Sequence, residues 1–174
     1  MAFGIDDALL AAAAGISLTD TCVKTIKSYQ KKGTPLDIER LIEEVRVTAL
    51  QRIDDADLAL VQLERTLEEH GVSLNMTLTE VISKTSFWKP FEAHRLKRIR
   101  RSFNELADAI YEAIDDIASL VRCREQTYEM GHAVVESADS KRKLLDNLSN
   151  SGSVKNSIDL LQGELRRHKA ALKH

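Results

Sequence analysis

The fold of this chain is decided by residues 34–71, TPLDIERLIEEVRVTALQRIDDADLALVQLERTLEEHG. Apolar residues recur there every three or four positions, which is the period of one face of an α-helix. They are Ile38, Ile42, Val45, Ala49, Ile53, Ala56, Leu60, Leu63 and Leu67. Thr34 and Pro35 are typical of an N-cap and a first helical residue, and Gly71 is typical of a helix end. At ~1.5 Å per residue the helix would be on the order of 50 Å long, which indicates an elongated bundle.

A second stripe of the same period begins after Pro90. Its members are Leu96, Ile99, Phe103, Leu106, Ile110, Ala113, Ile117 and Leu120. We expect this helix to continue past Cys123, with a kink near Gly131, as far as Leu148. A break follows at residues 150–153, and Ser153 is placed to cap a last helix whose apolar positions include Ile158, Leu161, Leu165 and Leu172.

The remaining segments complete a helical chain. A first helix is expected from Asp6 to Lys32, with Gly15 as its weak point, and a short helix from Thr77 to Lys84. The chain has only 7 Gly and 2 Pro among 174 residues, too few turn residues for a β-sandwich or barrel. These patterns predict an all-α protein, an elongated up-and-down bundle of four to five main helices. We expect one domain, residues 1–174, with a core of about 5–125 and an additional C-terminal helical segment of about 127–173.

Catalytic and metal-binding signatures are lacking from the sequence, so we expect neither an enzyme nor a bound cofactor. No nucleophile elbow, zinc-protease motif or phosphate-binding loop occurs. Cys22 and Cys123 are isolated, which fits small buried side chains in a reducing compartment, with a single disulfide as the alternative. The single Glu-x-x-His step at Glu129 and His132 falls short of a di-iron bundle, which needs two such steps and two further glutamates.

Charge is uneven along the chain despite a formal net charge of −2. Residues 36–70 hold ten acids and four bases, whereas residues 89–101 hold six bases and one acid. The six bases, which we call the basic run, are Lys89, Arg95, Lys97, Arg98, Arg100 and Arg101. One interpretation is a solvated helix face paired with the acidic helix. The other is a surface for anionic lipids, with the aromatic residues Phe87, Trp88 and Phe91 beside it either at the membrane interface or closing the end of the bundle.

The N-terminal segment has twelve consecutive positions without charge, between Asp7 and Asp20. It is too short to cross a bilayer as a single helix, and it lacks the basic start of a signal peptide. Small residues let helices approach closely, so the segment fits a close-packed core helix. It equally fits a segment that leaves the bundle and enters a bilayer. In that case the candidate membrane-active residues are Phe3, Ile5, Leu9, Leu10, Ala12 and Ile16.

The order of these features resembles the HeLo and HeLo-like domains of cell-death proteins. These features are the apolar N-terminal helix, the end of that helix at Lys24–Lys32, and the acidic helix whose sequence begins with DIERLIEE at Asp37. The resemblance covers residues 3–125. It implies a helical bundle whose extreme N-terminus inserts into membranes after oligomerisation, with basic residues that bind anionic lipids. Asp6 and Asp7 depart from this pattern, because acids there would have to meet the membrane, and residues 127–174 have no counterpart.

Two functions therefore follow as expectations. The first is a membrane-targeting effector of a regulated cell-death or immune pathway. Such a protein would be cytoplasmic, recruited to anionic membranes, and self-associating on activation. A signalling domain or partner protein is a further expected partner. The alternative is a non-enzymatic adaptor or structural bundle that binds a protein partner through a helix face. Nucleic acid is an unlikely partner, since the net charge is negative and no recognition fold is evident.

Overall fold

The protein is all α-helical over the residues that its computed structural model describes, which are 4–32, 35–85, 89–125 and 130–173. The side chains of residues 35–36, 122–125 and 130–136 are not included. Seven α-helices and one 3-10 helix follow one another through these residues. They are α1 (Ile5–Ile16), α2 (Thr19–Lys32), α3 (Pro35–Glu69), α4 (Leu78–Thr85), η1 (Lys89–Phe91), α5 (Glu92–Glu125), α6 (Met130–Ser149) and α7 (Val154–Leu172).

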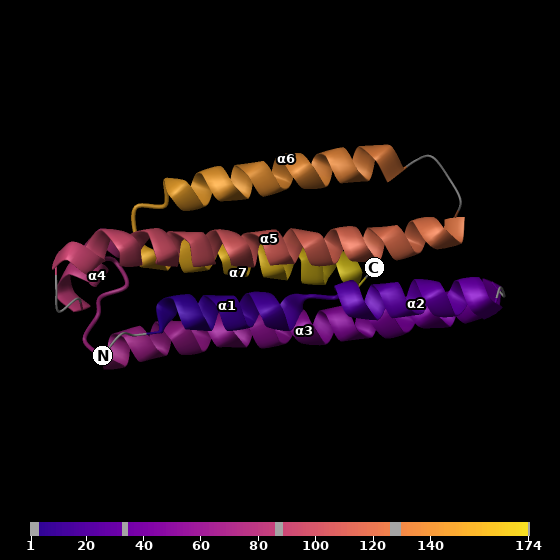
Figure 1. Ribbon diagram of the computed structural model, residues 1–174, viewed down its shortest axis with the longest axis horizontal. Coiled ribbons are helices and arrows are strands. Elements are labelled where there is room, and N and C mark those ends of the chain that lie inside the picture. The colour runs from indigo at the N-terminus through magenta and orange to yellow at the C-terminus, as the bar shows by residue number, and fades with distance from the viewer. Residues whose placement is uncertain (1–3, 33–34, 86–88, 126–129, 174) are drawn as a thin grey trace.

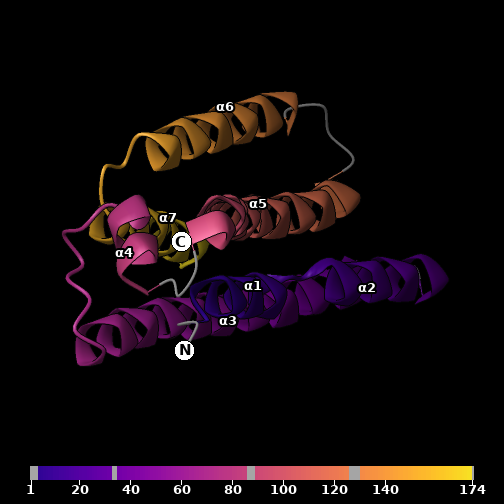
Figure 2. The same ribbon diagram turned by 60° about the vertical axis from the view of Figure 1, so that its left-hand side comes forward.

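The bundle is elongated, and its long axis follows α3 and α5 (Figure 1). The shorter helices α1 and α2 lie end to end along α3, and α1 also packs against α5. Helix α7 packs against α3 and α5, while α6 lies on the outer side of α5 (Figures 1 and 2). The expectation of an all-α bundle is confirmed.

The two predicted stripes are the centre of the core. In α3 every member except Ile42 is buried, and Ile42 packs against the core from a partly exposed position. In α5 every member is buried except Leu96 and Ile117, which pack against the core from partly exposed positions. One large cluster joins residues of α1, α3, α4, α5, α6 and α7, and a smaller one around Leu18 and Cys22 joins the start of α2 to α3 and α5. Helix α7 therefore belongs to the same core, through Val154, Ile158 and its other buried residues.

Three helix ends follow the local chemistry of the sequence. Gly71 has φ +73° and follows the last turn of α3, where its N–H donates to the carbonyl of Glu68 (2.9 Å). Thr77 and Glu80 form a reciprocal capping box at the start of α4. Ser153 caps α7, as expected, by accepting from the N–H of Asn156 (3.1 Å).

Two helix boundaries differ from the sequence prediction. The expected single helix from Asp6 to Lys32 is two helices, because Ser17 has an extended ψ of 130° and ends α1. The expected continuous helix past Cys123 is also two, since α5 ends at Glu125 and α6 packs back against it. Residues 33–34, where the N-cap Thr34 was predicted, lie outside the described residues.

Candidate membrane-interaction site

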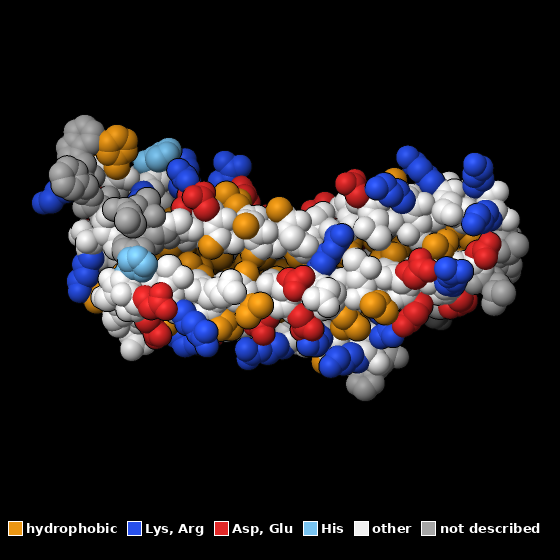
Figure 3. Space-filling view, turned by 90° about the horizontal axis from the view of Figure 1, so that it is seen from below, with side chains coloured by type: hydrophobic (Ala, Val, Ile, Leu, Met, Phe, Trp, Pro, Cys, Tyr) orange, Lys and Arg blue, Asp and Glu red, His pale blue; other side chains and the backbone are white. Residues whose placement is uncertain are grey.

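Helix α1 lies in the bundle with one face buried and one exposed. The buried candidates are Ile5, Leu9, Ala12 and Ile16, each at most 6% exposed. Leu10 is 37% exposed, and Phe3 lies outside the described residues. The exposed face carries no charge beyond Asp7, since it continues through Ala11, Ala14 and Gly15. On the side formed by α1, α2 and α3, hydrophobic side chains follow the middle of the face, with charged side chains to either side (Figure 3).

The N-terminal end of α1 is held by an ion pair with α5. Arg98 contacts the carboxylate of Asp6, and its Nη2 lies 3.5 Å from Asp7 Oδ1. The Asp6 side chain is 11% exposed, whereas that of Arg98 is 55% exposed. Both acids lie in the first turn of α1, where negative charge is favoured by the helix dipole. The two acids that depart from the HeLo pattern are therefore partners of one member of the basic run.

The C-terminal end of α1 is held at the break before α2. Arg52 of α3 donates to the carbonyl of Ser17, the residue that ends α1. Thr19, the first residue of α2, donates from Oγ1 to Asp116 Oδ2 of α5 (2.9 Å). Polar contacts at both ends and buried side chains between them thus keep α1 in place.

The six cations of the basic run do not form one face. A helix turns 100° per residue, so five neighbouring bases on α5 point to different sides. Arg98 points to α1, and Arg95 donates from Nη1 to Thr85 Oγ1 of α4 (3.2 Å). Ile99 between them is fully buried, as expected.

The other members of the run are exposed. Arg101 pairs along its own helix with Glu105 (2.7 Å). Lys97 makes no ion pair or hydrogen bond within the described part of the chain. Arg100 lies at a cavity between α4 and the loop that joins α6 to α7. Lys89 is in η1 next to Phe91, which is 56% exposed; Phe87 and Trp88 lie outside the described residues.

Three acids of α3 pair with α7, and Glu43 and Glu44 pair with arginines of α3 itself. Lys155 Nζ lies 2.9 Å from Glu64, Lys169 contacts Asp54, and Arg166 lies 3.7 Å from Asp57. The described ion pairs of the basic run are instead with α1 and with Glu105. The acidic and basic stretches of the sequence are therefore neutralised by different helices.

A polar cluster joins α5 to α7. Tyr111 is 2% exposed, and its hydroxyl donates to Glu164 Oε2 (2.7 Å). Arg167 donates to the hydroxyl oxygen of Tyr111 (2.9 Å) and to Glu164 Oε2 (2.7 Å). The His168 ring stands edge-on to Tyr111, with ring centroids 5.4 Å apart. Burial, with the Glu164 carboxylate, raises the pKa of Tyr111 to about 12, so its hydroxyl remains a donor at neutral pH.

His168 is expected to make the stability of the protein depend on pH. Burial and the positive charge of Arg167 lower its pKa, although Glu164 opposes that shift. Below the ordinary histidine pKa, near 6.5, the unfolded chain binds a proton that His168 in the folded protein does not bind. We therefore expect the free energy of unfolding to decrease as the pH is lowered through this range. Chemical denaturation at a series of pH values from weakly alkaline to weakly acidic should show this slope. In His168→Gln the slope should be smaller, and an unchanged slope would contradict the assignment.

Candidate metal ligands and the thiol of Cys22 lie among the described residues. No three His, Cys, Asp or Glu side chains among them gather as metal ligands. Cys22 is a buried free thiol whose pKa is raised to about 11, mainly by burial, so it is protonated at neutral pH. Glu129 lies outside the described residues, as does the side chain of His132.

The Ile5–Lys32 stretch, taken as one helix across the break at Ser17, is long and apolar enough to cross a membrane. This follows from length and composition alone, and buried helices of soluble proteins pass the same test. No family model, curated protein or solved structure matches the chain. The HeLo-like resemblance therefore stays a prediction.

Proposed function

We propose that this protein is a membrane-targeting helical bundle, an effector of a regulated cell-death or immune pathway whose α1 enters the bilayer. The observation that carries the proposal is the construction of α1. It has no charge after Asp7, an exposed face of Leu10 and small residues, and an end at a break in the helix. It would act from the cytoplasm at anionic membranes, without catalysis.

The length of α1 determines how it could act. Its 12 residues extend ~18 Å, against the roughly 30 Å of a bilayer's hydrocarbon core. One copy therefore cannot form a pore. Helix α1 alone inserts only partially, and a full span needs the longer Ile5–Lys32 stretch as one helix. A pore needs several copies in either case, so the proposal includes self-association on activation, driven by a signalling domain or partner protein.

Membrane entry requires α1 to leave the bundle. Its four buried apolar side chains oppose this, and so does the ion pair of Arg98 with Asp6 and Asp7. We assign Arg98 to holding α1, and the initial binding to the exposed bases Lys89, Lys97 and Arg101. Each exposed base near an anionic surface contributes about 1 kcal/mol, which salt screens.

The experiment compares two arginines three residues apart on α5. Wild-type protein should bind and permeabilise phosphatidylglycerol vesicles more than phosphatidylcholine vesicles, measured by co-sedimentation and dye leakage. Arg98→Gln should bind about as well but leak faster, because α1 is released more easily. Arg101→Gln removes the same charge without touching α1, and should bind and leak less.

The two variants are expected to change leakage in opposite directions, so the comparison tests the role of Arg98. If both variants leak less than wild type, Arg98 acts as a lipid ligand and does not hold α1. If wild type neither binds nor permeabilises either kind of vesicle, the membrane function is wrong. Melting temperatures of both variants show whether a change in leakage merely follows unfolding.

The adaptor function is the second candidate, and burial of α1 favours it. Ile5, Leu9, Ala12 and Ile16 join the large core cluster, as an ordinary core helix would. An adaptor would show no leakage at any lipid composition, and removal of α1 would unfold it.

A further inference from the structure

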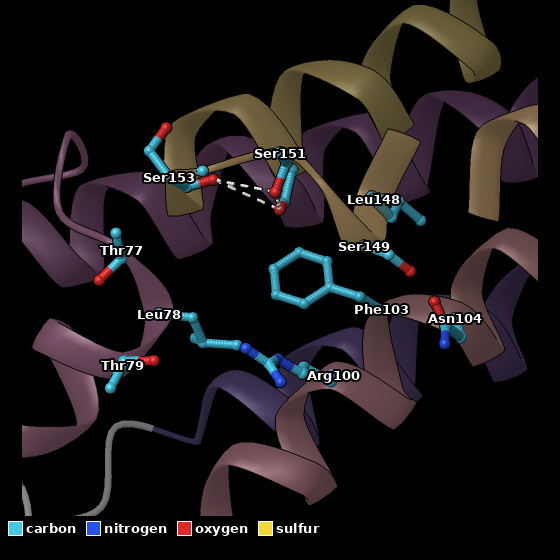
Figure 4. Close-up of a pocket in the computed structure, with 12 residues that line it drawn as sticks. Thr77, Leu78, Thr79, Arg100, Phe103, Asn104, Leu148, Ser149, Ser151 and Ser153 are labelled. Carbon is cyan, nitrogen blue, oxygen red and sulfur yellow. Dashed lines mark hydrogen bonds between the residues drawn. The ribbon is translucent and has the colours of Figure 1, made fainter. Parts of the chain in front are cut away.

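The cavity beside Arg100 has a volume of about 400 Å³ and is formed by elements far apart in sequence. Its walls are the first turn of α4, one side of α5, the end of α6 and the loop before α7. In the view of Figure 4 the ring of Phe103 lies below Ser151 and to the right of Leu78, and the side chain of Arg100 extends toward Leu78. Small-molecule sites commonly have ~300–1,000 Å³.

The charge of the cavity lining is positive. Arg100 is the only charged residue among the 12 that line the cavity. Its neighbours Arg98 and Arg101 are both paired with carboxylates. Arg100 itself has no ion pair or hydrogen bond to any described residue. An unpaired guanidinium at a cavity without carboxylates favours an anionic ligand.

Most of the hydroxyls in the lining already have partners. Thr77 is engaged with Glu80, Ser149 donates to a backbone carbonyl, and Ser151 and Ser157 bond to each other. Three polar groups keep donors for a ligand. Thr79 and Asn104 have no hydrogen bond within the described part of the chain, and Ser153 accepts through its oxygen and keeps its O–H.

The backbone at the start of α7 does not compete for this role. The N–H groups of Val154 and Lys155 donate to the carbonyls of Met76 and Leu74, at 3.1 and 2.9 Å. The N–H of Asn156 donates to Ser153. Recognition therefore depends on side chains: a guanidinium, an amide and two hydroxyls on α4, α5 and the loop. A tetrahedral oxyanion accepts from several directions at once, whereas a carboxylate favours two parallel bonds in its plane.

We propose that this cavity binds a small polar ligand through a phosphate group. Arg100 pairs with the phosphate and Thr79, on the same side of the cavity, donates to one of its oxygens, while the rest of the ligand lies over Phe103, toward Asn104 (Figure 4). The phosphate belongs either to a soluble phosphate ester or to a lipid headgroup. The proposal does not depend on permeabilisation, because a soluble ligand would bind without a membrane.

The test uses the full chain and two probes. Binding of glycerol 3-phosphate is measured by calorimetry. Binding to phosphatidylcholine vesicles, with and without phosphatidic acid, is measured by co-sedimentation. Arg100→Gln should weaken binding of the phosphate probe about tenfold or more, as loss of a charge-assisted pair implies. Arg101→Gln makes the same charge change on the next residue, outside the cavity, and should bind glycerol 3-phosphate as wild type does.

The two probes distinguish a soluble phosphate ester from a lipid headgroup as the source of the phosphate. Binding of glycerol 3-phosphate that Arg100→Gln weakens supports a soluble ester. Binding of phosphatidic acid vesicles alone, weakened by Arg100→Gln more than by Arg101→Gln, supports a headgroup. Binding of neither probe, or equal loss in the two variants, overturns the proposal. Circular dichroism checks the folding of each variant, and Thr79→Val gives a second, smaller loss that does not involve charge.

Discussion

Leu60→Asp is expected to unfold the protein. Leu60 is 1% exposed and lies in the middle of the buried stripe of α3, against the core that α3 shares with α1, α5 and α7. Truncation of a buried leucine to alanine removes ~2–5 kcal/mol, and an unpaired buried carboxylate adds a desolvation penalty. Domains have ~5–15 kcal/mol of stability in total, so little or none would remain. Circular dichroism and urea denaturation measure the loss.

Leu58→Asp is the matched control, two residues away on the same helix. Leu58 is 56% exposed, so its substitution should change the free energy of unfolding by only ~0.5 kcal/mol. The pair separates burial from helix propensity, because both variants place the same residue within α3. Equal stability of the two variants would mean that the face of α3 is assigned wrongly.

The long helices could be predicted because their signal is local and repeated. A stripe such as Ile38 to Leu67 has a single helical interpretation, and the structure buries almost all of it. The end of α3 before Gly71 and the Ser153 cap were predictable for the same reason, since a cap depends on residues within one turn.

The break after α1 and the reversal after α5 depend on contacts between distant residues. Neither Ser17 nor residues 126–129 contain the Gly or Pro that marks a turn. At Ser17 the extended backbone coincides with the bond from Arg52 and with the bond of Thr19 to Asp116, whose partners are 35 and 97 residues away. Gly15 and Gly131, the expected weak point and kink, mark the neighbourhood of the two breaks, but no local pattern contains these distant partners.

The candidate site shows the same limit. The basic run is visible as a cluster in the sequence, but a helix distributes neighbouring residues around its axis. Arg98 therefore meets α1, while Arg100 meets a cavity formed by α4 and the loop before α7. The pairing of Asp6 with Arg98, and the hydroxyls around Arg100, required the fold. Their residue types carry no spacing motif from which they could have been recognised.

Ala11→Glu is expected to abolish permeabilisation without harming the fold. Ala11 is exposed near the middle of α1, so a glutamate there remains in water and should change stability by only ~0.5 kcal/mol. If α1 enters the bilayer, the same carboxylate must enter hydrocarbon, at roughly 2.5–3.5 kcal/mol on insertion scales. Leakage of anionic vesicles should then fall on the order of 100-fold at an unchanged melting temperature.

Two control variants accompany Ala11→Glu: Ala12→Glu, at the next position, and Ala11→Gln, without the charge. Ala12 is 6% exposed, so Ala12→Glu should lower the melting temperature as well as the leakage, which shows that the two faces of α1 differ. Ala11→Gln has nearly the same size without the charge, and should keep most of the leakage. Permeabilisation by Ala11→Glu at the wild-type rate would mean that α1 never leaves the core. The same face of α1 would then have to be tested for a protein partner, because Leu10 and its small neighbours would still be exposed.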